Sequence, residues 1–200
     1  MPPKVQFTKN QIIDSAFSIA QETGIASMTV RKVSERLGCS VAPIYINFKN
    51  SEELISSVMD RIKELSWKYF TGTYTKIGFF NMGIGQLLFV RDYPRLFLDL
   101  FNSGNIGSEA NHPELYEQLI NIMMKDYMLK ELTREQNREL LLKMSIFTNG
   151  LSLELINRQG SLTLDGAMAM LEETAQQLVH SYKTDFLGSR IPQASKIIPE

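Results

Sequence analysis

The apolar residues of this chain recur with a helical period along most of its length, and this periodicity restricts the fold more than any other feature. Strand-like alternation is scarce, and there is no internal repeat or low-complexity segment. Thr8 and Gln11 form a capping box before the first periodic run, and Gly24 ends it, so we expect a helix over about 9–22. Similar start and stop signals follow along the chain. The sequence therefore predicts an all-α protein of about nine helices.

Two short helices joined by a glycine are expected between Thr29 and Phe48. Thr29 is placed to cap a helix over about 30–37, and Gly38 supplies the left-handed residue that ends it. We expect Ser40 to cap the next helix, because Pro43 is tolerated only in a first turn. With the supporting helix before them, these helices form a helix-turn-helix pattern, whose second helix enters the major groove of DNA.

Longer helices are expected after this unit. Asn50 caps a fourth helix that keeps its period to about residue 69, a length of roughly 28 Å at 1.5 Å per residue. The further expected helices span about 79–92, 94–102, 113–131, 133–159 and 163–184, with loops at 71–78 and 102–112. A helix at 133–159 is supported by a second capping box, formed by Thr133 and Gln136.

Two basic residues stand at the start of the Thr29-capped helix, where cations are locally unfavourable. Arg31 and Lys32 occupy its second and third positions, and the helix dipole disfavours each by typically 0.3 to 1 kcal/mol. A DNA phosphate bound there would reverse the sign of this effect. The alternative is that both are solvated surface charges.

The run TVRKVSERLGCSVAPIYINFKNSEEL resembles the DNA-binding domain of the tetracycline-repressor (TetR) family. The likeness covers about residues 8–62, and the matching positions are Gly38, Ser40, Tyr45, Phe48, Lys49 and Asn50. Asn47 and Cys39 depart from the family's common residues without affecting the fold. Ala42 and Pro43 replace the usual Gly and Thr, so the family's preference for particular bases cannot be carried over to this chain. The resemblance implies that Thr29, Tyr45 and Lys49 contact phosphates and that Ser40, Val41, Ala42 and Pro43 face the bases.

The resemblance also implies a divergent helical C-terminal domain that binds a ligand and dimerises through its last two helices. We therefore expect a helix-turn-helix DNA-binding domain at 1–50, a ligand-binding and dimerisation domain at 51–187 whose first helix, 51–69, is the link, and a tail at 188–200. Small residues and apolar stripes in the last two expected helices suit a bundle seam between subunits, with an intramolecular core as the alternative. The expected interface residues are Gly150, Leu151, Leu155, Ala167, Met168, Leu171, Ala175 and Leu178.

Large, soft side chains are numerous in the expected ligand-binding domain. Most must form ordinary core, but methionines and aromatic residues can also repack around an apolar guest. The expected ligand-pocket residues are Trp67, Phe70, Phe89, Phe97, Met123, Tyr127, Met144 and Phe147.

Signals for catalysis, metal binding and membrane insertion are absent from the sequence. There is no nucleophile elbow, HExxH motif or phosphate-binding glycine loop, so we expect no enzymatic activity and no cofactor. His112 and His180 lack metal-ligand spacing, and the single Cys39 suits a reducing compartment. With no leader-like or membrane-spanning segment, we expect a soluble cytoplasmic protein.

The formal net charge of −1 conceals an asymmetry along the chain. Residues 1–50 hold six Lys and Arg against three Asp and Glu, a net of +3, whereas residues 51–200 carry a net of −4. A basic N-terminal unit that is duplicated in a dimer suits a localised contact with the DNA backbone.

These features together predict a transcriptional repressor that binds a palindromic DNA operator as a homodimer and responds to a small, largely apolar effector. The alternatives are an activator of the same fold and a helical enzyme, lipid carrier or other small-molecule-binding protein that does not act on DNA.

Overall fold

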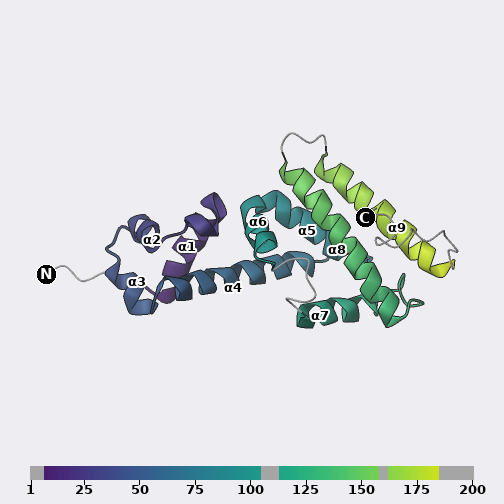
Figure 1. Cartoon of the computed structure of the whole chain (residues 1–200), viewed down its shortest axis with the longest axis horizontal. Helices are drawn as coiled ribbons and strands as arrows, with labels where there is room; N and C mark the ends of the chain where they lie inside the picture. The colour runs from purple at the N-terminus through teal and green to yellow at the C-terminus, as the bar shows by residue number, and fades with distance from the viewer. Residues whose placement is uncertain (1–6, 105–112, 158–161, 185–200) are drawn as a thin grey trace, which may run out of the picture.

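The computed structural model describes residues 7–104, 113–157 and 162–184, and these are helical with short connections (Figure 1). The N-terminal head consists of α1 (Lys9–Thr23), α2 (Val30–Leu37) and α3 (Ala42–Asn47), with a 3₁₀ turn, η1 (Ile25–Ser27), between the first two. The long helix α4 (Ser51–Phe70) leads from the head to the rest of the molecule. The body contains α5 (Gly78–Asp92), α6 (Pro94–Asn102), α7 (Pro113–Met123), α8 (Arg134–Ile156) and α9 (Leu164–Lys183). The all-α prediction is confirmed, with nine α-helices in the described ranges.

The helix starts follow from local capping. The boxes at Thr8 and Thr133 are both complete, and Thr29 and Asn50 each accept a hydrogen bond from the backbone N–H three residues on. Gly38 ends α2 in the left-handed region at φ 67°, as predicted.

The start of α3 differs from the prediction. Ser40 does not cap this helix, because the N-cap position is Val41, which makes no side-chain capping bond. The backbone N–H of Cys39 first bonds back to the Ser34 carbonyl at 3.0 Å, which completes the end of α2 and delays the next helix. Pro43 then falls within the first turn of α3, where its missing N–H leaves no hydrogen bond unmade.

Helix α7 is shorter than the predicted 113–131. It ends at Met123, and turns follow it. The buried Asp126 carboxylate accepts hydrogen bonds from the backbone N–H groups of Phe79 (2.8 Å) and Met128 (2.9 Å). This carboxylate satisfies a backbone donor in the first turn of α5, so a tertiary contact replaces the helix that the local pattern favours. The predicted tail at 188–200 and the last two residues of the helix predicted at 133–159 lie outside the described residues.

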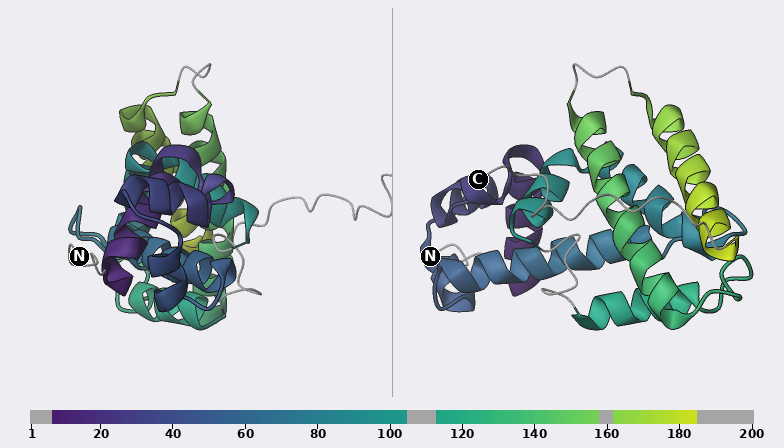
Figure 2. Two further views of the ribbon diagram at one scale, coloured as in Figure 1. Left: turned by 90° about the vertical axis from the view of Figure 1, so that its left-hand side faces the viewer. Right: turned by 45° about the vertical axis from the view of Figure 1, so that its right-hand side comes forward.

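Two apolar cores meet along α5. The first combines the head with α4, α6 and the C-terminal half of α5, which contributes Phe89 and Val90. The second lies between α5, α7, α8 and α9 and includes Leu87. Figure 2 shows α8 and α9 lying side by side at the end of the molecule away from the head. Helix α5 thus connects the head side of the molecule to the helices of the body.

Candidate nucleic-acid interface and ligand cavity

The head holds α3 at the surface through a few buried anchors. Ile44 and Phe48 are 1% exposed and pack with the fully buried Val33 of α2. The Asn47 side chain donates hydrogen bonds to the carbonyls of Pro43 (2.9 Å) and Phe7 (3.2 Å), which ties α3 to the segment before α1. One side of α3 is therefore fixed inside the head, and the other faces solvent.

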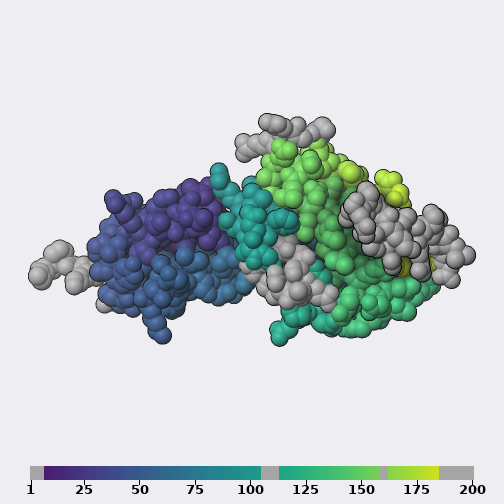
Figure 3. Space-filling view, viewed as in Figure 1, coloured from purple at the N-terminus to yellow at the C-terminus, as the bar shows by residue number. Residues whose placement is uncertain are grey.

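The predicted DNA-contact residues belong to α2, α3 and the segments beside them, in the head, which forms one end of the elongated molecule (Figure 3). All are exposed except Pro43, which is half-buried; the exposed residues are Thr29, Arg31, Lys32, Ser40, Val41, Ala42, Tyr45 and Lys49. Ile46 was not among the predicted contacts, yet its side chain is 83% exposed on α3. The helical period could have identified it, since it lies two residues from the buried Ile44 and so on the opposite face.

Charged groups lie on α2, which precedes α3 in the chain, and in the connection from α3 to α4. The Arg31 side chain is 85% exposed and bonds to Glu35 at 2.8 Å, so it remains at the surface. After α3, the Glu53 carboxylate accepts hydrogen bonds from the Lys49 backbone N–H (2.8 Å) and from the Lys9 ammonium (3.1 Å). These bonds hold the pKa of Glu53 below its ordinary value. Glu53 therefore stays ionised and fixes the connection between α3 and α4.

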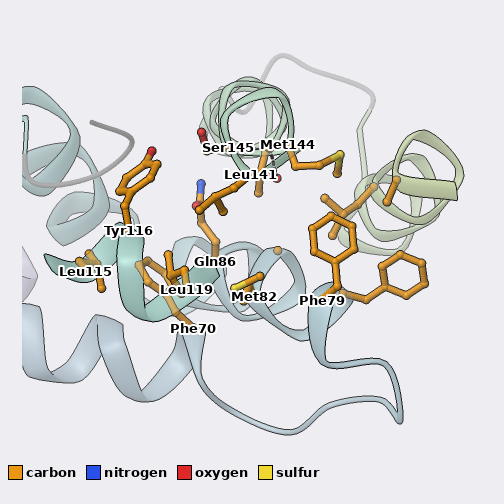
Figure 4. A pocket seen from close by; sticks show the side chains of 15 residues that line it. Phe70, Phe79, Met82, Gln86, Leu115, Tyr116, Leu119, Leu141, Met144 and Ser145 are labelled. Carbon is orange, nitrogen blue, oxygen red and sulfur yellow. Dashed lines mark hydrogen bonds between the residues drawn. The ribbon is translucent and has the colours of Figure 1, made fainter. Parts of the chain in front are cut away.

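A cavity of about 100 Å³ lies in the body, between α5, α7, α8, α9 and the last residue of α4 (Figure 4). Its walls are mostly aromatic and aliphatic, with no acidic or basic side chain among them. The lining residues are Phe70, Phe79, Phe80, Met82, Gly83, Gln86, Leu115, Tyr116, Leu119, Leu141, Met144, Ser145, Thr148, Leu171 and Ala175.

Two of the eight predicted pocket residues, Phe70 and Met144, line this cavity. Phe89 and Phe97 instead fill the core shared by α4, α5 and α6, and Met123 is buried in the second core. Tyr127 is 63% exposed in the turns after α7. Trp67 and Phe147 are half-buried and lie outside the lining. Residue type alone therefore did not separate cavity walls from ordinary core.

Gln86 supplies the main polar group of the cavity wall. Its side-chain amide nitrogen donates to the Asn149 side-chain oxygen at 2.9 Å and to the Ser152 hydroxyl oxygen at 3.0 Å. Because these bonds use both hydrogens of the amide, a guest that hydrogen-bonds to Gln86 must donate to its carbonyl oxygen. This geometry suits an uncharged molecule with a hydroxyl or N–H group.

The cavity touches the helix that leads to the head. Phe70 lines the cavity at the end of α4, and the preceding Tyr69 bonds through its hydroxyl to Asp92 at 2.8 Å. Burial and this hydrogen bond raise the pKa of Tyr69 above its ordinary value. A second link joins body and head, since the Asp99 carboxylate of α6 accepts from the Ile25 N–H at 2.8 Å.

The predicted dimer-interface residues differ in exposure: some are buried inside the subunit and others reach its surface. Leu151, Ala167, Leu171 and Ala175 are buried in the second core, so for these four the intramolecular alternative describes the structure. Gly150 is exposed, and the half-buried members are Leu155, Met168 and Leu178. The large apolar side chains that α8 and α9 expose are Leu142, Ile146, Leu153 and Met170.

Other functional sites receive no support from the described residues. Within them, no group of three or more His, Cys, Asp or Glu side chains is arranged to hold a metal ion. His180 is exposed near the end of α9, and His112 lies outside the described ranges. None of the helices in those ranges has the length and apolar character needed to cross a bilayer.

Comparisons with known proteins agree with this geometry. Residues 12–58 match the family model described as "Bacterial regulatory proteins, tetR family". A search of curated proteins gives no match. A TetR variant from Acinetobacter baumannii AYE in complex with minocycline has a similar structure, with 16% identity, coverage of 92% of this chain and 99% of that chain, and a TM-score of 0.57. A TetR-like transcriptional regulator from Rhodococcus sp. RHA1 is similar at 14% identity, with coverage of 88% and 97% and a TM-score of 0.61. The chain therefore carries the N-terminal domain of the tetR family of bacterial regulatory proteins and has the all-helical fold of solved TetR-type regulators.

Proposed function

We propose that this protein is a transcriptional repressor that binds a palindromic DNA operator as a homodimer and is released by a small, largely apolar ligand. The observation that carries the proposal is the exposed face of α3, on a head of net charge +3 that also exposes the basic residues Arg31, Lys32 and Lys49. A helix held this way can enter the major groove while the flanking cations meet phosphates. In this proposal residues 1–50 bind DNA, 51–187 bind ligand and dimerise, and 188–200 form a tail.

The ligand that suits the cavity is small and uncharged. An engineered cavity of about 150 Å³ accommodates benzene, so a space of about 100 Å³ admits only a small guest unless its walls move. Met82 and Met144 are flexible and can repack to enlarge it. The similar Acinetobacter structure contains minocycline, which supports a ligand site in a fold of this type.

Release of DNA would proceed through α4. This helix has 20 residues and therefore extends about 30 Å from the end of α3 to the cavity wall at Phe70. A ligand that displaces Phe70 favours another position of α4. Because α4 carries the head, the distance between the two copies of α3 in the dimer then changes as well. Its effect on DNA binding is limited by its difference in affinity for the two arrangements.

Dimerisation would use the outer faces of α8 and α9. Their exposed apolar residues, Leu142, Ile146, Leu153 and Met170, give these helices an apolar surface that a second copy can cover. A two-fold dimer built in this way presents two heads to one face of a duplex, which accounts for a palindromic site.

The test compares Lys49→Ala with Lys125→Ala, which removes an exposed positive charge from the body. Binding of random-sequence duplex DNA is measured by fluorescence anisotropy over a range of salt concentrations. We expect Lys49→Ala to weaken binding across sequences and to reduce the steepness of the salt dependence by about one phosphate contact per head, with Lys125→Ala close to the parent. Equal effects of the two substitutions would contradict the proposed orientation of the head.

A further inference from the structure

The exposed face of α3 is apolar. Ala42 and Ile46 lie two residues before and after the buried Ile44, and at about 100° per residue both therefore point to the opposite side of the helix. Ile46 is 83% exposed, more than any other large apolar side chain in the described ranges. The neighbouring Val41 is 42% exposed and Tyr45 is 53% exposed. Single exposed apolar residues are common, but three large ones within six positions form a local surface.

The usual hydrogen-bonding readers of base edges are missing from this face. No charged residue occurs between Arg36 and Lys49, so α3 offers no Arg or Lys for the paired acceptors of guanine. Asn47 could in principle pair with adenine, but its amide nitrogen is bonded to the carbonyls of Pro43 and Phe7 inside the head. The exposed hydrogen-bonding side chains left are Ser40 and Tyr45.

The surroundings of this apolar face favour DNA over an apolar protein partner. Arg31 and Lys32 are exposed at the start of α2, and Lys49 is exposed just after α3. This arrangement complements a major groove, where phosphates border both sides and thymine presents a methyl group from the floor. The small Ala42 side chain lets the α3 backbone approach the bases closely.

We propose that α3 recognises thymine C5-methyl groups in the major groove, through Ile46 with Val41 and Ala42. This inference rests on the proposed DNA-binding function and specifies its substrate, which is an operator half-site defined by thymine methyl contacts and not by hydrogen bonds to guanine. Ile46 is thereby assigned as the main specificity-determining residue.

The experiment begins with selection of preferred duplexes by the full chain from a random-sequence library at low salt. Each thymine of the selected half-site is then replaced in turn by uracil, which removes only the methyl group. We expect affinity to fall about fourfold at the thymine that contacts Ile46, which is the effect of losing one buried methyl-sized group. Ile46→Ala should bind the parent duplex more weakly by a similar factor and should be insensitive to uracil at that position.

Ile122→Ala is the matched control, because it shortens an exposed isoleucine in α7, away from the head. It should retain the parent affinity and the parent response to uracil. Selected half-sites without thymine, or uracil duplexes that all bind like the parent, would overturn the inference while leaving DNA binding intact. A chain that binds no duplex at low salt would instead overturn the proposed function itself, so the two failures are distinguishable.

Discussion

Gly85 of α5 packs directly against the backbone at the end of α4, and adding one methyl group there tests the link between α4 and the body. An alanine Cβ at this position would lie 2.0 Å from the Tyr69 carbonyl oxygen and 3.1 Å from the Phe70 Cα. Real Cβ contacts stay beyond 3.0 Å, so the end of α4 must move by at least about 1 Å. The obstacle is backbone, which cannot rotate away as a side chain can.

The expected cost of Gly85→Ala follows from two opposing effects. Overpacking a tight contact costs typically 1 to 3 kcal/mol, and a clash this severe belongs near the upper limit. Replacing a helical glycine by alanine gains roughly 0.5 to 1 kcal/mol from reduced backbone freedom in the unfolded chain. We therefore expect a net loss of about 2 kcal/mol in the free energy of unfolding, measured by urea denaturation with circular dichroism.

Gly83→Ala, two residues earlier in the same helix, is the matched control. Its new Cβ would meet the Leu171 side chain at 2.6 Å, and this side chain can change rotamer. The glycine-to-alanine gain and the rearrangement then nearly cancel, so the unfolding free energy should stay within about 1 kcal/mol of the parent. If Gly85→Ala were as stable as Gly83→Ala, the close contact between α4 and α5 would be refuted, and with it the route from cavity to head.

Three further predictions concern the cap of α4, an ion pair and the dimer. Asn50→Ala removes the side chain that accepts from the Glu53 N–H at 2.9 Å, and should lower the unfolding free energy by about 1 kcal/mol in urea titrations. Hydrogen bonds from Arg91 and Tyr69 lower the pKa of Asp92, so the ionised carboxylate stabilises the fold above about pH 4 and loses this effect as the pH falls. The difference in unfolding free energy between the parent and Asp92→Asn should therefore shrink on acidification. A difference that stays constant with pH would contradict this prediction. Ile146→Asp places a charge on an exposed apolar position of α8 and should convert the proposed dimer to a folded monomer in sedimentation velocity; an unchanged dimer would place the interface elsewhere.

The sequence predicted most features of the fold whose cause lies within a few residues, although the cap expected at Ser40 is absent. The caps at Thr8, Thr29, Asn50 and Thr133 depend on a side chain and a backbone group three residues on, so they were predictable and are present. The early end of α7 depends on a contact between Asp126 and Phe79, which are 47 residues apart. No local pattern contains that information.

The candidate sites divide in the same way. Exposure of the predicted contacts on α2 and α3 followed from the helix-turn-helix pattern, although the outward position of Ile46 was overlooked. The cavity was harder to predict, because Phe89 and Phe70 are chemically alike and only their packing decides which one lines it. The small residues of α9 were taken as an intersubunit seam, whereas Ala167 and Ala175 let this helix pack within its own subunit.

The most direct test of the central claim, that the head binds DNA, is a salt titration of the unmodified chain with duplex DNA. The basic residues of two heads should displace counterions from several phosphates, so the logarithm of affinity should fall steeply and linearly with the logarithm of salt concentration. Selected palindromic duplexes should bind more tightly than random sequence at every salt concentration. Absence of binding at low salt, or an affinity that does not change with salt, would contradict the account.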